Sequence, residues 1–138
     1  MELEEQLGDH LRREESVEVA YLFGSRSRGE GGRLSDVDVA VCLDESLSSS
    51  ERFNLRLRLM SEIASLLKAD AVDLVVMNDS SASLNYEAIK GRLIYARDPS
   101  RKVEIEHRVM SKYLDRRYYD KRALDAFLRK VSEKGLNW

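Results

Sequence analysis

Two aspartates, Asp36 and Asp38, stand one residue apart in the segment DVDVAVCLD, which is typical of a β-strand. Because side chains alternate along a strand, both carboxylates project from one face while Val37, Val39 and Val41 point into a core on the other. Two carboxylates so close repel each other unless a cation lies between them, and such pairs hold Mg²⁺ together with substrate phosphates. The pattern therefore predicts a divalent-metal site, with a solvated strand end as the alternative.

A third aspartate, Asp73, lies within the apolar segment AVDLVVM, residues 71–77. An ionised carboxylate is costly to bury there without a partner. If this segment is a strand beside the Asp36 and Asp38 strand, three carboxylates gather in one place. That is what a two-metal site needs in order to clamp the attacking and leaving oxygens of an in-line displacement. The alternative is a strand-end carboxylate that accepts a hydrogen bond from a backbone amide.

A glycine-rich segment, GSRSRGEGGRLS (residues 24–35), precedes the aspartate pair and must be a loop. Gly24 would let the backbone approach a ligand closely, and Ser25 could offer its hydroxyl and N–H to a phosphate at the start of a helical turn. Arg26 and Arg28 carry guanidinium groups that suit phosphate oxygens. Each residue alone is an ordinary turn or loop residue, but the spacing G-S-x10-D-x-D is rare by chance, and the combination predicts a phosphate site.

The elements that position these residues follow from hydrophobic periodicity and turn residues. We expect helix 2–14, strand 17–23, loop 24–35, strand 36–44, helix 48–68, strand 71–77, helix 82–90, strand 92–96 and, after the break at Asp98-Pro99, one bent or two consecutive helices. The continuous apolar run of 71–77 predicts a buried position in the sheet. In helix 48–68 the predicted apolar stripe is Phe53, Leu57, Met60, Ala64 and Leu67, broadened by Leu55, Leu59 and Ile63. The order indicates an α/β or α+β domain with a small sheet covered by helices.

Composition limits the class of protein. The chain has 138 residues, 43% of them hydrophobic, with a net charge of −2, so one folded domain is expected rather than a disordered segment. A single cysteine, Cys42, allows no intrachain disulfide, and no apolar run approaches the roughly 20 residues of a membrane span, so we expect a cytoplasmic protein. Residues 1–100 carry 12 basic and 19 acidic side chains, whereas residues 101–138 carry 11 basic and 6 acidic.

The motifs FGSRSRG, SDVDVAV and VDLVV, in this order over roughly residues 15–98, resemble the nucleotidyltransferase superfamily that includes DNA polymerase beta, kanamycin nucleotidyltransferase and poly(A) polymerases. They are most similar to the minimal nucleotidyltransferases of prokaryotes, the MntA-like antitoxins encoded beside HEPN-domain toxins. Ser27 departs from the usual alanine, a small-for-small change.

The resemblance implies a nucleotidyltransferase fold, with a small mixed β-sheet flanked by helices. Residues 1–98 would be the nucleotidyltransferase core and residues 99–138 a C-terminal helical extension of the same domain. It also implies site roles, in which nucleotide phosphates bind Gly24 and Ser25 with the nearby Arg26 and Arg28, two Mg²⁺ ions bind the aspartates, and the third aspartate also helps to deprotonate the acceptor hydroxyl. The three aspartates are Asp36, Asp38 and Asp73.

The implied reaction is transfer of AMP from ATP to a tyrosine hydroxyl of a HEPN toxin, which silences that toxin and makes this chain its antitoxin. No second domain follows to hold the acceptor, so a partner protein is expected to supply it, and the basic segment 101–134 would dock an acidic face of that partner. Two alternatives stay open. The chain could be a nucleotidyltransferase-fold binding module that neutralises the toxin by occlusion, or an enzyme that modifies a small molecule such as an aminoglycoside.

Overall fold

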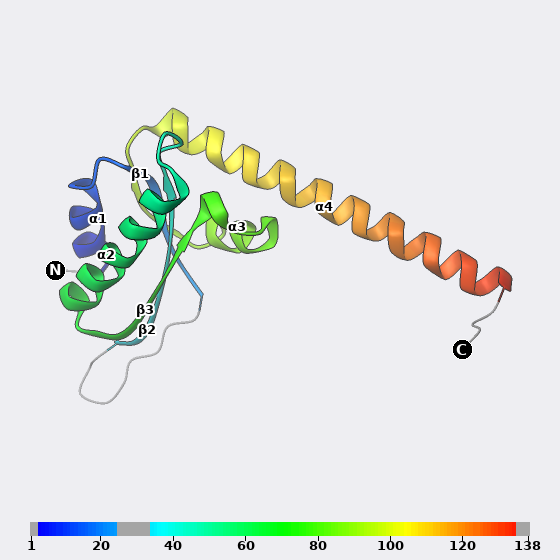
Figure 1. Ribbon diagram of the computed structural model, residues 1–138, viewed down its shortest axis with the longest axis horizontal. Coiled ribbons are helices and arrows are strands. Elements are labelled where there is room, and N and C mark those ends of the chain that lie inside the picture. Colours follow the sequence, from blue (N-terminus) through cyan, green and yellow to red (C-terminus); the bar gives the residue numbers. More distant parts are fainter. Residues whose placement is uncertain (1–2, 25–33, 135–138) are drawn as a thin grey trace.

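In the computed structural model, which describes residues 3–24 and 34–134, four strands form one mixed sheet in the order β3-β2-β1-β4 (Figure 1). Strand β1 (Val17–Phe23) runs antiparallel to both β2 (Leu34–Leu43) and β4 (Arg92–Ala96). Strand β3 (Ala69–Val76) runs parallel to β2, because helix α2 (Ser49–Leu67) carries the chain back between them. The predicted small mixed sheet with flanking helices is confirmed.

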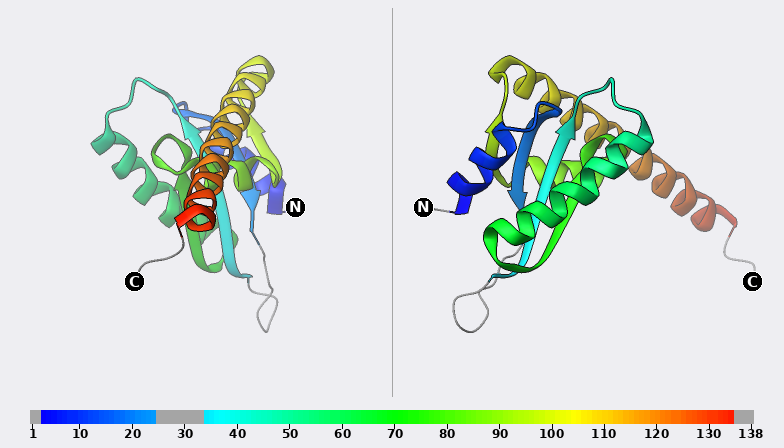
Figure 2. Two further views of the ribbon diagram at one scale, coloured as in Figure 1. Left: turned by 90° about the vertical axis from the view of Figure 1, so that its right-hand side faces the viewer. Right: turned by 60° about the vertical axis from the view of Figure 1, so that its left-hand side comes forward.

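Helices α1 (Leu3–Arg12) and α2 cover one face of this sheet, as the right view of Figure 2 shows. The core beneath them contains Val37, Val39 and Val41, as predicted. From α2, however, the buried side chains are Leu55, Leu59 and Ile63, whereas Phe53 and Leu57 are 55% and 48% exposed. At 100° per residue these two groups lie on nearly opposite sides of the helix. The other members of the predicted stripe, Met60, Ala64 and Leu67, are partly buried against the core, so the stripe is wrong at Phe53 and Leu57 only. Apolar residues lie on both sides of this helix, and packing decides which of them are buried.

Helix α3 (Ala82–Ile89) and the first turns of helix α4 (Pro99–Lys134) cover part of the other face. Here Val19, Tyr21 and Ala40 from the sheet pack against Ile105 and Val109 of α4. The hydroxyl of the buried Tyr21 donates a hydrogen bond of 2.5 Å to the carboxylate of Glu106, which fixes the angle at which α4 leaves the sheet.

Strand β3 lies at the edge of the sheet, which corrects the predicted buried position. Its side chains Val72, Leu74 and Val76 are buried nonetheless, because they pack into the core beneath α2. A continuous apolar run reports that side chains are covered on the faces of a strand, but not whether another strand lies beside it. Along this open edge no other described strand lies beside β3. The carbonyls of Leu74 and Val76 accept hydrogen bonds from the side chains of Arg56 and Ser80, respectively.

Helix α4 is one continuous helix of 36 residues, where one bent or two helices were expected. No glycine or further proline occurs between Ser100 and Lys134 to interrupt it. Its start is held by Arg101, which lies 3.1 Å from the carboxylates of both Glu18 and Glu45. Among the described helices, none has the length and apolar character that crossing a membrane requires.

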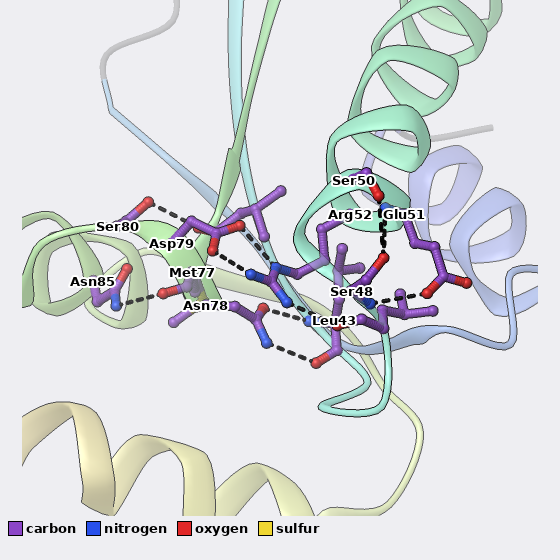
Figure 3. Close-up of polar contacts among 12 residues, drawn as sticks. Leu43, Ser48, Ser50, Glu51, Arg52, Met77, Asn78, Asp79, Ser80 and Asn85 are labelled. Atoms are coloured by element: carbon purple, nitrogen blue, oxygen red, sulfur yellow. Dashed lines mark hydrogen bonds and ion pairs between the residues drawn. The ribbon is translucent and has the colours of Figure 1, made fainter.

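A polar network joins the ends of β2 and β3 to the start of α2 (Figure 3). Ser48 caps α2 in a capping box with Glu51, and Arg52 donates to both carboxylate oxygens of Asp79 at 2.9 and 2.7 Å. Asp79 belongs to a short 3-10 helix, η2 (Met77–Asp79), whose first residue is the last residue of the predicted strand 71–77. The adjacent Asn78 accepts from the N–H and donates to the carbonyl of Leu43, so its side chain ends β2 and favours the turn. This network fixes α2 beside the edge of the sheet.

Candidate functional site

Asp36, Asp38 and Asp73 lie on one face of the sheet, because β2 and β3 are neighbours. Asp38 and Asp73 are direct partners in the parallel register, and Asp36 pairs with Ala71 two residues earlier on each strand. Adjacent strands lie about 5 Å apart, and residues two apart along a strand about 7 Å, so the three side chains project over one small area. Strand adjacency was the condition under which the sequence predicted three gathered carboxylates, and that condition is met.

This area is an open pocket lined by the three aspartates together with Val37, Ala71 and Val72. Asp36 and Asp73 are exposed and Asp38 is half-buried. Partial burial raises the pKa of Asp38, and the negative charges of Asp73 and Asp36 raise it further. The carboxylates therefore repel one another, and a bound cation would relieve the repulsion.

The three carboxylates are an all-oxygen donor set, which is what Mg²⁺ prefers. Within residues 3–24 and 34–134, no three His, Cys, Asp or Glu side chains converge into a group able to hold a metal ion unaided. Mg²⁺ in enzymes keeps several waters and substrate phosphates and takes only one or two carboxylates from the protein. An open row of aspartates fits that mode of binding, in which the nucleotide completes the coordination.

Gly24 closes this site from the end of β1. Its φ is +73°, in the left-handed region that favours glycine, and a Cβ built on it would lie 2.5 Å from Oδ2 of Asp38. The contact arises because Phe23, the last residue of β1, pairs with Asp38 across the antiparallel ladder. The structure therefore brings the predicted glycine against the predicted aspartate pair. Ser25, Arg26 and Arg28, the other predicted phosphate-binding residues, lie outside the described residues.

Arg56 of α2 reaches the same site and was missed from the sequence. Its Nε donates a 2.7 Å hydrogen bond to the carbonyl of Leu74 at the open edge of β3, and its Nη2 lies 3.8 Å from Oδ1 of Asp73. The only sequence signal is that Arg52 and Arg56 are four residues apart and so share one side of the helix. Both line a second cavity, which meets the aspartate pocket at Asp73. Arg56 thus places a cation beside an exposed carboxylate of the site.

Other candidate residues have structural surroundings. Burial, and secondarily the negative charge of Glu18, raises the pKa of the half-buried Cys42 thiol to about 11, so this thiol is not suited to act as a nucleophile. Tyr86 stacks on Tyr113 of α4, with ring centroids 3.8 Å apart and planes 6° apart, so it packs between helices.

Comparison with known proteins gives a family match. The family model described as polymerase beta, nucleotidyltransferase, matches residues 5–100, which include Gly24 and all three aspartates. Among curated proteins, the protein adenylyltransferase MntA of Shewanella oneidensis is 37% identical over 73 residues, which are 53% of this chain and 49% of that protein. The match thus spans about half the length of this relative.

Solved structures share the fold. A crystal structure of a toxin–antitoxin with AMP-PNP matches with a TM-score of 0.68 and 23% identity over 91% of this chain and 98% of that one. The MntA–HepT toxin–antitoxin matches with a TM-score of 0.66 and 22% identity over 91% and 97%. A tri-AMPylated Shewanella oneidensis HEPN toxin in complex with MNT antitoxin matches with a TM-score of 0.65 and 20% identity over 92% and 99%.

Proposed function

Because this chain belongs to the polymerase beta, nucleotidyltransferase family, we propose that it transfers AMP from ATP to a tyrosine hydroxyl of a HEPN-domain toxin and so acts as its antitoxin. The observation that carries the proposal is the row of three carboxylates on one open sheet face, with the backbone of Gly24 against Asp38. The curated relative is named a protein adenylyltransferase, and solved structures with the same fold hold an AMPylated HEPN toxin, which supports this choice of acceptor.

Each residue has a proposed role. Asp36, Asp38 and Asp73 would hold two Mg²⁺ ions together with the triphosphate of ATP. Gly24 and Ser25 hold the phosphates through backbone and hydroxyl groups, with Arg26 and Arg28 beside them. When bound, the two ions neutralise phosphate charge and lower the pKa of the attacking hydroxyl.

The transfer is an in-line displacement. The tyrosine oxygen attacks the α-phosphorus of ATP, the bond from that phosphorus to the bridging oxygen breaks, and pyrophosphate leaves. The hydroxyl proton passes to a carboxylate oxygen of Asp73. Asp73 suits this role because its side chain is 64% exposed and lies on the edge strand, where a large acceptor can approach. Positioning of acceptor and nucleotide supplies much of the rate enhancement.

The domain division belongs to the same proposal. Residues 1–98 form the catalytic core, and residues 99–138 extend it as a helical element of one domain. A cytoplasmic location is part of the same proposal, because ATP is the proposed donor.

The decisive experiment is intact-mass analysis of the HEPN protein encoded beside this chain's gene, after incubation with this chain, ATP and Mg²⁺. We expect one or more adenylate increments, and none with Asp38→Asn. Neutralisation of the toxin by Asp38→Asn without any increment would replace the proposal with occlusion. An increment that persists with Asp38→Asn would contradict the assigned site.

A further inference from the structure

The outer part of α4 leaves the body of the protein. The last buried residue of α4 is Val109, and one turn later Tyr113 stacks on Tyr86 of α3. Beyond Tyr113 the helix extends away from the sheet and from α3, as Figures 1 and 2 show. Residues 114–134 would span about 32 Å at the rise of an α-helix. We call this segment, residues 114–134, the arm.

Large apolar side chains are exposed on the arm. Leu124, Phe127 and Leu128 are 56%, 57% and 52% exposed, and Val131 follows with partial exposure. Their spacing of i, i+3, i+4 and i+7 places the four on one side of the helix, which we call the tip stripe. This spacing is typical of a helix that lies in an apolar groove of another protein. A helix segment in water gains little stability from helix propensity alone, so a partner that buries the tip stripe would stabilise the arm.

Unpaired positive side chains lie along the arm. Lys121, Arg129 and Lys130 make no ion pair with any described residue, and Arg122 only donates to the hydroxyl of Tyr118 and lies over its ring. By contrast, Arg101 and Arg108 nearer the body are paired with Glu45. Unpaired basic side chains are therefore more frequent on the arm than at the base of α4. The basic docking surface predicted for residues 101–134 is thereby narrowed to residues 114–134.

Charge distinguishes a foreign partner from a second copy of this chain. The arm carries seven basic and four acidic side chains, so pairing two arms would bring like charges together. A partner with carboxylates around an apolar groove would instead neutralise them. The base of α4, before the arm, packs on the sheet face that carries Asp36 and Asp38, because Ile105 and Val109 pack against Ala40, which alternation places on that same face.

We propose that the tip stripe docks into a carboxylate-rimmed apolar groove of the acceptor protein and so holds the acceptor opposite the aspartates. This inference rests on the proposed function, since it takes the acceptor to be the HEPN protein. The arm supplies binding free energy at a distance from the reacting atoms, which helps to hold a protein substrate in place.

The test compares binding and transfer in the full-length chain with the HEPN protein encoded beside its gene as the probe. Leu124→Glu/Leu128→Glu should raise the dissociation constant about 30-fold or more, because central apolar contacts are lost. Lys121→Glu/Arg129→Glu should weaken binding of the HEPN protein at low salt and reduce the salt dependence of that binding. Tyr119→Ala is the matched control, because Tyr119 is 69% exposed but lies off the tip stripe, and it should bind as the wild type does.

Four outcomes separate the inference from the proposed function. Normal binding by both arm variants would overturn the inference even if AMP transfer occurs. Lost binding in the arm variants, with tight binding but no transfer for the wild type, would support the arm and refute the proposed function. Sedimentation of the free chain as a dimer that Leu124→Glu/Leu128→Glu converts to monomer, with HEPN binding unchanged, would assign the tip stripe to a second copy. Binding to anionic phospholipid vesicles through the tip stripe, with HEPN binding unchanged, would overturn it in favour of a membrane surface.

Discussion

The backbone of Gly24 lies against the carboxylate of Asp38, so close that a Cβ on the glycine would be 2.5 Å from Oδ2. Gly24 also has a φ of +73°, which other residues adopt at a cost. Two requirements therefore coincide at one residue, a left-handed backbone and the absence of a side chain. Both belong to the position of Gly24, directly after the end of β1 and beside the strand that carries the aspartates.

Gly24→Ala should reduce AMP transfer strongly, on the order of 100-fold. The added Cβ would clash with Asp38, so Asp38 or the backbone at residue 24 must move out of its position in the site. The left-handed backbone should also cost about 1–2 kcal/mol of stability. Steady-state transfer rates and thermal unfolding measure the two effects. Gly8→Ala is the control, since its Cβ would meet the carbonyl of Ile94 at 3.1 Å, away from Asp38, and should leave transfer unchanged in the folded fraction.

Divalent cations should stabilise the chain, because they relieve repulsion among Asp36, Asp38 and Asp73. At tenfold excess over the dissociation constant, Mg²⁺ with a non-hydrolysable ATP analogue should add about 1.4 kcal/mol to the free energy of unfolding, and EDTA should remove it. The pKa of Asp38 is raised in the metal-free chain, so protons compete with the cation and the gain should shrink as the pH falls.

Thermal unfolding with and without the cation measures this gain across pH. Asp38→Asn should abolish most of it, whereas Asp115→Asn, an exposed change on α4, should not. An equal gain in the wild type and in Asp38→Asn would place the cation elsewhere.

Arg56→Ala should affect transfer more than its effect on stability suggests. It removes the 2.7 Å hydrogen bond to Leu74 and the cation beside Asp73, for about 1 kcal/mol of stability and about tenfold in transfer. Arg52→Ala is the matched change one turn earlier. It breaks the paired contact with Asp79 and a bond to the Leu47 carbonyl, so it should destabilise at least as much while reducing transfer less. The reverse ranking of transfer rates would show that Arg56 is structural only.

The Cys42 thiol should be nearly inert in the folded chain at pH 8. With its pKa raised to about 11, only about one thiol in a thousand is ionised there, compared with roughly a quarter for an ordinary cysteine of pKa about 8.5. Alkylation by iodoacetamide should be more than 100-fold slower in the native chain than in denaturant and should accelerate as pH rises toward 11. Similar native and denatured rates at pH 8 would contradict the buried, protonated state.

Local order made much of this protein predictable. Alternation along residues 36–44 correctly placed Val37, Val39 and Val41 in the core and the aspartates on the opposite face, because that pattern depends only on the two-residue period of a strand. The bounds of β1 and β4 match their predicted ranges, since turn residues flank both strands. The predicted roles of the aspartates and of Gly24 stay predictions until the experiments above are done.

By itself, the sequence identified candidate residues for the chemistry, namely the aspartate pair, Asp73 and the glycine, and indicated that the chain alternates strands and helices. Only the tertiary structure decided that β3 lies at the sheet edge, that Arg56 reaches Asp73, which apolar residues of α2 are buried, and that the arm of α4 leaves the body. The reason is physical. Residue type and periodicity report a side chain's preference for water or core, whereas strand order and helix direction follow from contacts between segments distant in the chain, which no local pattern encodes.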